Sequence, residues 1–371
     1  TCELGKVNYD DLASEVITSS ATYPVWVGWS IIDKIGERVK TVYDAKVAYV
    51  VADEGVSSHA RRVQVSMESA GIPTYLFFVP SGENHKNLDT VKHIYSWLAN
   101  HKAERGHMIV AVGGGVIGDL AGFVAATYLR GMPFSQVPTT LLSMMDASIG
   151  GKVAVDMEQG KNLVGSFYQP KFVLSDVETL NTLPARELTS GWAEAIKHGL
   201  ILDESLLNLF EEKHSEIAAL DPEISTEIIR KSVAINARVV SEDEKETLGI
   251  RILLNYGHTV GHAIESTTGY SKYLHGEAVS IGMMAAALLS NSMGMMSDEE
   301  VRRQEIVLNQ YDLPTTSDAI ESEKIIEAIK SDKKTVGGSV NWVLLSKIGK
   351  AVTNNEVPET FLLEALSQLS K

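Results

Sequence analysis

Short apolar runs typical of β-strands alternate with helical runs over the first half of the chain, and this alternation constrains the fold more than any other feature. The predicted strands are Lys46–Asp53, Tyr75–Pro80, His107–Val112, Phe134–Val137 and Phe172–Leu174. Helical periodicity follows the first three strands, over Ser57–Ala70, Leu88–Lys102 and Asp119–Leu129. Strand–helix–strand connections within one sheet are right-handed and make the strands parallel. We therefore predict an α/β fold whose N-terminal part is a Rossmann-like nucleotide domain built on a parallel sheet.

The pattern changes after Asp176, where helical periodicity dominates. The predicted helices are Leu188–Leu202, Glu204–Leu220, Pro222–Asp243, His258–Thr267 and Glu277–Ser292. Near the end, Val340–Ser346 and Ala351–Val357 predict a hairpin, and Pro358–Leu369 predicts a closing helix. A chain of 371 residues has room for about two domains. We predict an α/β domain over residues 1–180 and a mostly α-helical domain over residues 181–371.

A glycine run follows the third predicted strand. Gly113 to Gly118 fits the pattern G-x-G-x-x-G and opens a predicted helix. In that context glycine lets backbone N–H groups meet a pyrophosphate at the helix N-terminus. A tight turn without a ligand is the alternative. No acid lies about 20 residues downstream, where a dinucleotide fingerprint has one, so Asp53 at the end of an earlier strand is the better candidate for a ribose contact.

Composition limits the partners of the chain. Asp and Glu number 48 against 33 Lys and Arg, a net charge of −15 that disfavours nucleic acid and anionic membranes. No apolar run reaches the about 18 residues that a membrane helix needs, and Thr1 to Ala21 show no leader pattern. The single cysteine excludes a disulfide framework within the chain. We expect a cytoplasmic protein with a small-molecule ligand, and an anionic ligand would need a local pocket of positive charge.

Histidines gather in one short window of the second half. His258 and His262 are four residues apart, on one face of a helix, and His275 follows soon after. Three histidines with nearby acids suit Zn²⁺ with one coordination position left for substrate. Ordinary core or surface histidines are the alternative, and the spacing does not say which acid completes the set.

Other charged residues are ambiguous on spacing alone. Glu194 and Lys197 lie three residues apart, which favours a surface helix ion pair over a catalytic one. Several cations sit beside Gly, Asn or Asp at the ends of predicted elements. Cations at loop tips are usually solvated, although a neighbouring glycine also lets the chain approach an anion closely. These cations are Arg130, Lys152, Lys161, Arg251 and Lys333.

Collinear motifs over nearly the whole chain resemble 3-dehydroquinate synthases. They run from about Lys46 to Val357 and form a specific set. The segments that carry the resemblance are Val110–Leu129 (VAVGGGVIGDLAGFVAATYL), Val137–Leu142 (VPTTLL), Asp146–Val155 (DASIGGKVAV), Gly160–Pro170 (GKNLVGSFYQP), Leu183–Leu188 (LPAREL), Ala193–Lys197 (AEAIK), Arg251–Glu265 (RILLNYGHTVGHAIE), Leu274–Met283 (LHGEAVSIGM) and Asp332–Lys334.

The resemblance implies an enzyme of the shikimate pathway. It would convert 3-deoxy-D-arabino-heptulosonate 7-phosphate to 3-dehydroquinate and phosphate, with NAD that is reduced and reoxidised within one turnover and with Zn²⁺ or Co²⁺. Phosphate elimination and an intramolecular aldol closure would complete the reaction. The resemblance also implies an NAD-binding first domain and a metal- and substrate-binding second domain. A homodimer is a family expectation only.

The resemblance also implies roles for individual residues. The metal ligands would be Glu194, His258 and His275, which replaces the surface interpretation of Glu194. The catalytic residues would be Asp146, Lys152, Lys197, Asn255 and His262. The substrate contacts would be Arg130, Lys152, Asn162, Arg251, Asn255, His262 and Lys333. The NAD contacts would be Asp53, Glu83, Lys86, Gly114, Gly115, Val116, Asp119, Thr139, Thr140, Lys161, Thr182, Leu183 and Glu187.

Two positions depart from the family pattern. Asn236 stands where family members usually have a lysine that reaches the substrate's hydroxyl region. Arg238 is two residues on and about 200° around a helix, so it is a poor replacement. The approach from Glu246 to Arg251 is also one residue longer, which predicts a local shift that could bring Lys245 or Glu246 inward.

Three alternative functions remain on sequence alone. A related sugar-phosphate cyclase, of the amino-dehydroquinate or valiolone type, is the nearest. Lys152 and Arg251, which match the family's carboxylate-binding cations, argue against the valiolone type but not against the amino variant. A metal-dependent polyol dehydrogenase needs no phosphate pocket, so Arg130, His262 and Lys333 argue against it. A homologue that binds ligands without turnover would not need an intact metal triad.

Overall fold

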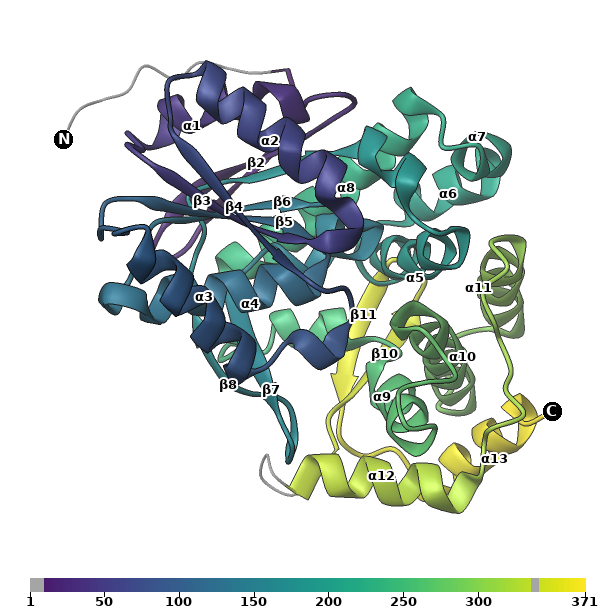
Figure 1. The fold of residues 1–371 in the computed structure, drawn as a ribbon. Helices are drawn as coiled ribbons and strands as arrows, with labels where there is room; N and C mark the ends of the chain where they lie inside the picture. Colours follow the sequence, from purple (N-terminus) through teal and green to yellow (C-terminus); the bar gives the residue numbers. More distant parts are fainter. Residues whose placement is uncertain (1–9, 335–339) are drawn as a thin grey trace. The chain divides into compact units, whose positions relative to one another are not determined.

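Seven strands form the main sheet, in the order β1-β2-β9-β6-β5-β3-β4 (Figure 1). Only β1 runs antiparallel to its neighbour; every other pair is parallel. The strands are β1 (Leu12–Ile17), β2 (Thr22–Gly28), β3 (Ala48–Asp53), β4 (Thr74–Val79), β5 (Met108–Gly113), β6 (Phe134–Pro138) and β9 (Val173–Asp176). The predicted α/β class with a parallel sheet is confirmed.

Helices cover both faces of this sheet. Tyr49 and Val51 of β3 pack with α3 (Leu88–Asn100) and α4 (Gly115–Thr127), while Ala48, Val50 and Ala52 pack with α1 (Ile35–Val42) and α2 (Ser57–Ser69). Figure 1 shows these helix pairs on opposite sides of the strands. A strand buried on both faces has no polar side to alternate with, which is why β3 and β5 are continuous apolar runs.

The computed structural model describes residues 10–334 and 340–371, and the side chains of residues 332–334 lie outside that description. The chain divides into two compact units. The first is Thr1–Leu183 with Ser225–Glu244, and the second is Pro184–Ile224 with Lys245–Lys371. The helix α8 (Pro222–Glu242) thus lies mainly in the first unit. The predicted domains 1–180 and 181–371 stay a prediction, because packing alone does not show which part folds independently.

The second unit is mostly helical, as expected. Its centre is α10 (His275–Ser292), which is buried over most of its length and packs on α5, α9, α11, α13 and β10. The surrounding elements are α5 (Ala185–Leu202), α6 (Glu204–Glu212), α7 (His214–Ala218), α9 (His258–Thr267), α11 (Asp298–Gln310), α12 (Ser322–Lys334), β10 (Trp342–Lys347), β11 (Lys350–Asn354) and α13 (Glu359–Leu369).

Several elements differ from the prediction. Strands β1 and β2 and the antiparallel hairpin of β7 (Lys152–Met157) and β8 (Gly160–Phe167) were not expected. The single helix predicted over 204–220 is two helices, α6 and α7, and neither α11 nor α12 was predicted. Strands β1 and β8 are largely exposed or half-buried, so they lack the apolar run that identifies a buried strand.

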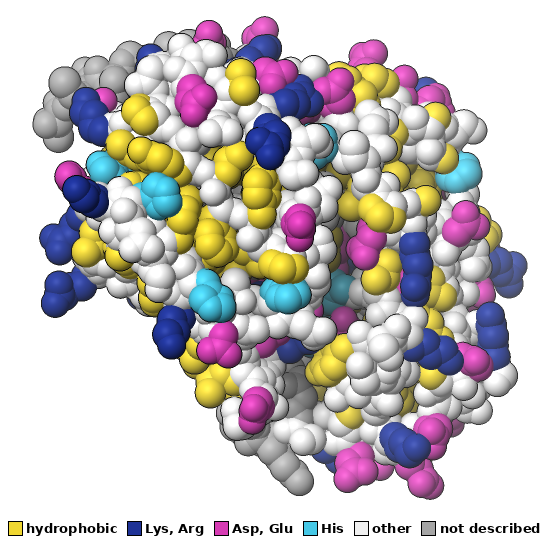
Figure 2. Space-filling view, viewed as in Figure 1, with side chains coloured by type: hydrophobic (Ala, Val, Ile, Leu, Met, Phe, Trp, Pro, Cys, Tyr) yellow, Lys and Arg dark blue, Asp and Glu magenta, His cyan; other side chains and the backbone are white. Residues whose placement is uncertain are grey.

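On the face drawn in Figure 2, acidic and basic side chains are interspersed. Among the residues that the structure describes, none of the helices combines the length and the apolar character that crossing a bilayer requires.

Candidate metal centre and nucleotide site

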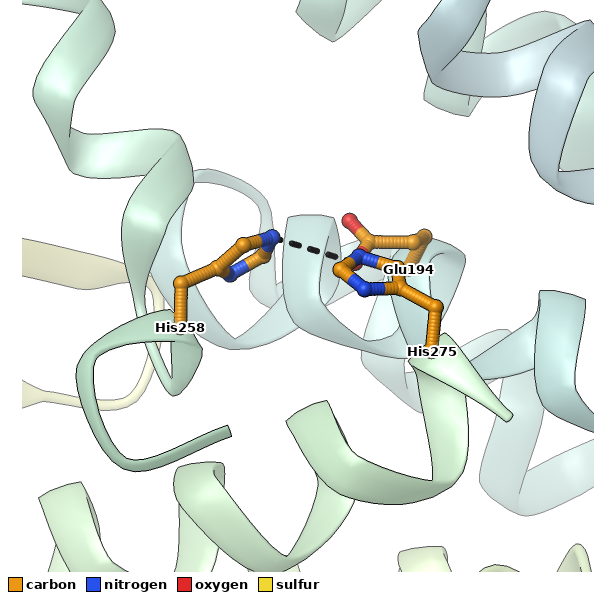
Figure 3. A group of neighbouring side chains, drawn as sticks. All are labelled: Glu194, His258 and His275. Carbon is orange, nitrogen blue, oxygen red and sulfur yellow. Dashed lines mark ion pairs between the residues drawn. The ribbon is translucent and has the colours of Figure 1, made fainter. Parts of the chain in front are cut away.

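Three side chains of the second unit converge on one point. Glu194 projects from α5, His258 is the first residue of α9 and His275 is the first residue of α10 (Figure 3). One ligand atom from each lies within 4.8 Å of the other two. The Nε2 atoms of His258 and His275 are 3.6 and 3.7 Å from Oε1 of Glu194. These separations exceed a hydrogen bond and match ligand atoms that surround a common ion.

Glycines allow the three helices to approach this closely. A Cβ atom on Gly276, next to His275, would overlap the carbonyl oxygen of Ser190 in α5. A Cβ atom on Gly282 would overlap the carbonyl oxygen of Gly257, the left-handed residue (φ 81°) that precedes His258. The two glycines of α10 therefore set how near the histidines come to Glu194.

The Glu194 carboxylate is fully buried and its two oxygens face different surroundings. Oε2 forms an ion pair with Lys197, whose ammonium also donates a hydrogen bond to the carbonyl oxygen of Leu254 (2.5 Å). Oε1 faces the histidines and accepts no hydrogen bond within the described residues. The surface ion pair favoured by the spacing of Glu194 and Lys197 is wrong, because α5 is buried continuously from Ser190 to Ile201.

Hydrogen bonds at Nδ1 orient both histidine rings. His258 Nδ1 lies 3.2 Å from the carbonyl oxygen of Tyr256, and His275 Nδ1 lies 3.3 Å from Oε1 of Glu265. Both partners accept, so each Nδ1 carries the hydrogen and each Nε2 turns its lone pair toward Glu194. Outer partners of this kind are typical of metal-bound histidines.

The electrostatics of the two histidines differ. Burial, followed by the charge of Lys197, holds the pKa of His258 well below its ordinary value. Burial also disfavours a charged His275, but its hydrogen bond to Glu265 and the charges of Glu194 and Glu265 outweigh burial and raise its pKa. When both rings are neutral, two lone pairs and a buried carboxylate oxygen face one another, and a cation between them would satisfy all three. Two imidazoles and one carboxylate fit Zn²⁺ with an open position for substrate oxygen.

A second group shares one member with the first. His262, Glu265 and His275 also bring their ligand atoms within 4.8 Å of one another. His262 lies beside His258, with ring centroids 5.3 Å apart, so the predicted placement on one helix face is confirmed. His262 is exposed, however, whereas Glu194 is fully buried. The group of Glu194, His258 and His275 is therefore the better metal site.

Several of the predicted nucleotide contacts lie at one edge of the main sheet. Asp53 ends β3, Gly113 ends β5 and Thr139 follows β6. Because the strands are parallel, their carboxyl ends meet at the same edge, where open α/β sheets bind nucleotides. Gly114 is the N-cap of α4, which confirms the predicted strand–turn–helix context. A Cβ atom on Gly118 would overlap the end of the Gln136 side chain of β6, which would have to move aside.

Lys86 is the centre of a polar cluster in the first unit. Its ammonium donates a hydrogen bond to Oδ1 of Asn162 (2.8 Å) and forms ion pairs with Glu83 (2.9 Å) and Asp119 (3.3 Å). Lys161 lies 3.6 Å from the same Glu83 oxygen. Burial raises the pKa of Asp119 to about 7, although Lys86 acts in the opposite direction. Four residues predicted to contact NAD and one predicted to contact phosphate therefore touch one another.

The other predicted site residues are divided between the two units. The first unit holds Arg130, exposed in a left-handed conformation (φ 65°), Asp146 in the short π-helix Ser143–Ala147, and Lys152 at the start of β7. Within the second unit, Arg251 and Asn255 begin and end the short helix Arg251–Asn255. The Lys333 side chain lies outside the described residues. Among the predicted NAD contacts only Glu187 lies in the second unit.

The two departures from the family pattern have clear local structures. Asn236 is buried, and its amide donates hydrogen bonds to the carbonyl oxygen of Met145 (2.9 Å) and to Oδ1 of Asp146 (3.1 Å). Arg238, two residues further along α8, is exposed. In the longer approach to Arg251, Glu246 pairs with Arg251 (3.5 Å) and Lys245 is exposed.

Comparison with known proteins gives a single family over most of the chain. Residues 76–190 match the family model described as 3-dehydroquinate synthase N-terminal, and residues 191–335 match the one described as 3-dehydroquinate synthase C-terminal. The chain belongs to the 3-dehydroquinate synthase family. Relatives named 3-dehydroquinate synthase include one from Desulforamulus reducens, 43% identical over 95% of this chain and 99% of its own length. Another, from Prochlorococcus marinus, is 41% identical over 98% of this chain and all of its own length.

Solved structures of related cyclases share the fold. The 2-epi-5-epi-valiolone synthase of Streptomyces hygroscopicus, solved with NAD⁺ and Zn²⁺ bound, is 25% identical, covers 94% of this chain and 97% of its own, and has a TM-score of 0.85. A 2-deoxy-scyllo-inosose synthase with carbaglucose-6-phosphate, NAD⁺ and Co²⁺ is 28% identical over 96% and 99% of the two chains, with a TM-score of 0.83. A probable glycerol dehydrogenase from Sinorhizobium meliloti, 15% identical, shares the fold alone.

Sequence reasoning missed the residues that support the site in this member of the 3-dehydroquinate synthase family. Glu265 and the carbonyl of Tyr256 orient the two histidines, and Asp156 lies 3.6 Å from Lys86. The one available signal was the placement of Glu265 three residues after His262, on the same helix face. Nothing in the sequence connects Asp156 with Lys86, which is 70 residues away.

Proposed function

We propose that the chain converts 3-deoxy-D-arabino-heptulosonate 7-phosphate to 3-dehydroquinate and phosphate. The observation that carries the proposal is the buried Glu194 oxygen that accepts no hydrogen bond and faces two histidine lone pairs, in a chain of the 3-dehydroquinate synthase family. We infer that Zn²⁺ or Co²⁺ is held by Glu194, His258 and His275, and that NAD binds at the carboxyl edge of the main sheet. Related cyclases solved with these cofactors support both inferences.

The chain's own residues prepare the metal position. When bound, the ion raises the acidity of a substrate hydroxyl, which favours its oxidation. Lys197 holds one oxygen of Glu194 so that the other faces the histidines. Glu265 and the Tyr256 carbonyl keep each Nδ1 protonated and each Nε2 free to bind. The ligand set is thereby fixed before any ion arrives.

The remaining residues position a small substrate that is anionic at both ends. A phosphate dianion and a carboxylate each need fixed cations and hydrogen-bond donors. We propose that Arg130, Asn162, Asn255, His262 and Lys333 bind the phosphate, and that Lys152 and Arg251 bind the carboxylate. Asp146 and Lys197 would contact the ring hydroxyls. Loss of a proton beside a newly formed ketone needs only a modest base, so the protein contributes mainly orientation and charge stabilisation.

The test is a phosphate-release assay with the heptulosonate phosphate, with and without EDTA, in which the product is identified by mass. We expect stoichiometric phosphate and 3-dehydroquinate, and loss of both with EDTA. Glucose 6-phosphate, which lacks the carboxylate, is the comparison substrate and should release little phosphate. Release from glucose 6-phosphate alone would contradict the proposed substrate and favour an inosose-type cyclase. Net NADH accumulation with glycerol would favour a polyol dehydrogenase. Cytoplasmic location and a homodimer remain predictions, checked by cell fractionation and by light scattering.

A further inference from the structure

The side chain of Asp156 lies between two residues to which the proposed function gives different ligands. Lys86 is a proposed NAD contact and Asn162 a proposed phosphate contact. Asp156 belongs to β7, at the point where the pairing of β7 with β8 becomes irregular, between Val155 and Met157. It matches no motif that the sequence singles out, and it belongs to neither proposed set.

The backbone of Asp156 attaches this hairpin to the segment before α3. Its N–H donates a hydrogen bond to the carbonyl oxygen of Lys86 (2.7 Å), and Asn87 and Asp156 form an isolated parallel bridge. These contacts do not involve the side chain. A substitution at position 156 can therefore remove the carboxylate and leave the hairpin attached.

The carboxylate closes a ring of three residues. Oδ1 of Asp156 accepts a hydrogen bond from the backbone N–H of Asn162 (2.9 Å) and lies 3.6 Å from the ammonium of Lys86. Lys86 in turn donates to the side-chain oxygen of Asn162 (2.8 Å). Asn162 has a left-handed backbone (φ 57°), a conformation that asparagine adopts more readily than most residues other than glycine. The hydrogen bond from its N–H to Asp156 stabilises that conformation.

The direction of Lys86 is set by its acceptors. The ammonium has three hydrogens, and it has four acceptor groups near it, on Glu83, Asp119, Asp156 and Asn162. Its side chain is 5% exposed, so water does not replace a lost acceptor easily. Lys86 can donate to a ligand only after it gives up one of these partners, and the others then determine where it points.

We propose that Asp156 is a positioning residue that fixes Lys86 and Asn162 as one unit, so that the nucleotide site and the phosphate site form together. The inference rests on the proposed function for the roles of these two residues. Because both contacts depend on one carboxylate, ligand binding at one site favours binding at the other. Such coupling is reciprocal: NAD raises phosphate affinity by the same factor as phosphate raises NAD affinity.

The test compares Asp156→Ala and Asp156→Asn with Glu158→Gln, an exposed acid of the same hairpin. Binding of NAD, and of inorganic phosphate with NAD present, is measured by calorimetry on the zinc-loaded protein. Since hydrogen bonds to charged groups are worth about 1.5–3 kcal/mol, we expect both Kd values to rise about tenfold or more in Asp156→Ala. Asp156→Asn should show a smaller rise, because its amide oxygen can still accept from Asn162. Glu158→Gln should bind both probes like the unaltered protein.

Two simpler roles for Asp156 would give different binding data. If Asp156 acted only through its negative charge, its removal would tighten the binding of an anionic nucleotide, and Asp156→Asn and Glu158→Gln would both bind NAD more strongly. If it only stabilised the fold, thermal unfolding would shift and turnover would fall with both Kd values unchanged. Either result would overturn the proposal. An unaltered protein that binds both probes but releases no phosphate from the heptulosonate phosphate would contradict the proposed substrate, and the binding data would still decide the role of Asp156.

Discussion

The metal group of the second unit (Glu194, His258 and His275) and the cluster around Lys86 in the first unit, here called the lysine cluster, differ in what satisfies their buried polar groups. In the metal group, the atoms that face one another are all acceptors: the Nε2 atoms of His258 and His275 and one oxygen of Glu194. In the lysine cluster, a buried cation is surrounded by three carboxylates and an amide oxygen. The first arrangement is completed by an ion from outside, while the second is complete within the chain.

This difference separates two kinds of buried polar residue. A group whose partner is a ligand can be removed with little effect on folding, because the folded chain alone does not satisfy it. A group whose partners are in the chain contributes to stability, and its removal leaves those partners buried and unpaired. Substitutions in the metal group should therefore affect ligand binding most, and substitutions of an internally paired group that contacts no proposed ligand, such as Asn236, should affect stability most.

The largest effect is expected at the metal group. His275→Ala should remove metal and turnover together, by at least about a thousandfold in kcat/KM, because a three-ligand site rarely survives loss of one ligand. Metal content is measured by mass spectrometry of the dialysed protein, and folding by circular dichroism. His93→Ala, an exposed histidine of α3, is the control. Full metal occupancy in His275→Ala would refute the ligand assignment.

A large effect on one ligand only is expected at Arg251. Arg251→Ala should raise KM for the heptulosonate phosphate about a hundredfold, since an uncompensated carboxylate loses about 3 kcal/mol of charge-assisted hydrogen bonding. The Kd for NAD should change less than twofold. Steady-state kinetics and NAD calorimetry measure the two quantities. Equal weakening of both ligands would count against a carboxylate contact.

A substitution at Glu265 should have a smaller effect than those at His275 and Arg251, and it should affect only the affinity for the metal. Glu265→Gln keeps an acceptor for His275 Nδ1 but removes the charge that supports the ring. Loss of such outer partners typically weakens metal binding by about 10–100-fold, and we expect the lower end of that range. Competition with a zinc chelator gives the affinity. Unchanged metal affinity would mean that the charge of Glu265 does not contribute to metal binding through His275.

The elements of the first unit could be predicted wherever burial is complete. The expected strand Lys46–Asp53 is β3 (Ala48–Asp53), because a strand covered on both faces is an uninterrupted apolar run. Strand β1 (Leu12–Ile17) was missed because it mixes polar and apolar residues and pairs with a single neighbour. The glycine turn was recognisable because strand, turn and helix follow directly in sequence.

The site was less predictable from spacing, since its members come from different helices. Spacing pairs His258 with His262, whereas the fold brings His258 to Glu194, 64 residues earlier in the chain. An i, i+3 pair such as Glu194 and Lys197 looks the same on a surface helix and on a buried one. Family motifs supplied what spacing lacked. They assigned no role to Asp156 or Glu265, whose partners are set by packing.

A substitution at Asn236 tests whether removal of an internally paired group of the first unit lowers stability. Asn236→Leu keeps the branched shape of the side chain but removes both donors, leaving the Met145 carbonyl without this partner and Asp146 without this hydrogen bond. The free energy of unfolding should fall by about 1–3 kcal/mol. Urea unfolding measures it, and Asn236→Lys, which restores a donor, is the matched variant. Stability equal to that of the unaltered protein would show that these hydrogen bonds contribute nothing measurable.

The smallest effect is expected at Glu244, which joins α8 to the turn between β1 and β2. Burial raises its pKa, but hydrogen bonds from Ser19, Ser20 and Gln169 outweigh burial and lower the pKa to about 2, against an ordinary value of 4.5. A carboxylate with a depressed pKa stabilises the folded state above its unfolded pKa, and this contribution is lost as pH falls from 4.5 toward 2. Because the group is partly exposed, it contributes about 1 kcal/mol. The difference in unfolding free energy between the unaltered protein and Glu244→Gln should therefore shrink as pH falls from about 4.5 toward 2. Glu242→Gln, which replaces the exposed last residue of α8, is the control. A difference for Glu244→Gln that does not change with pH would mean that the shape of the side chain, and not its charge, holds the turn.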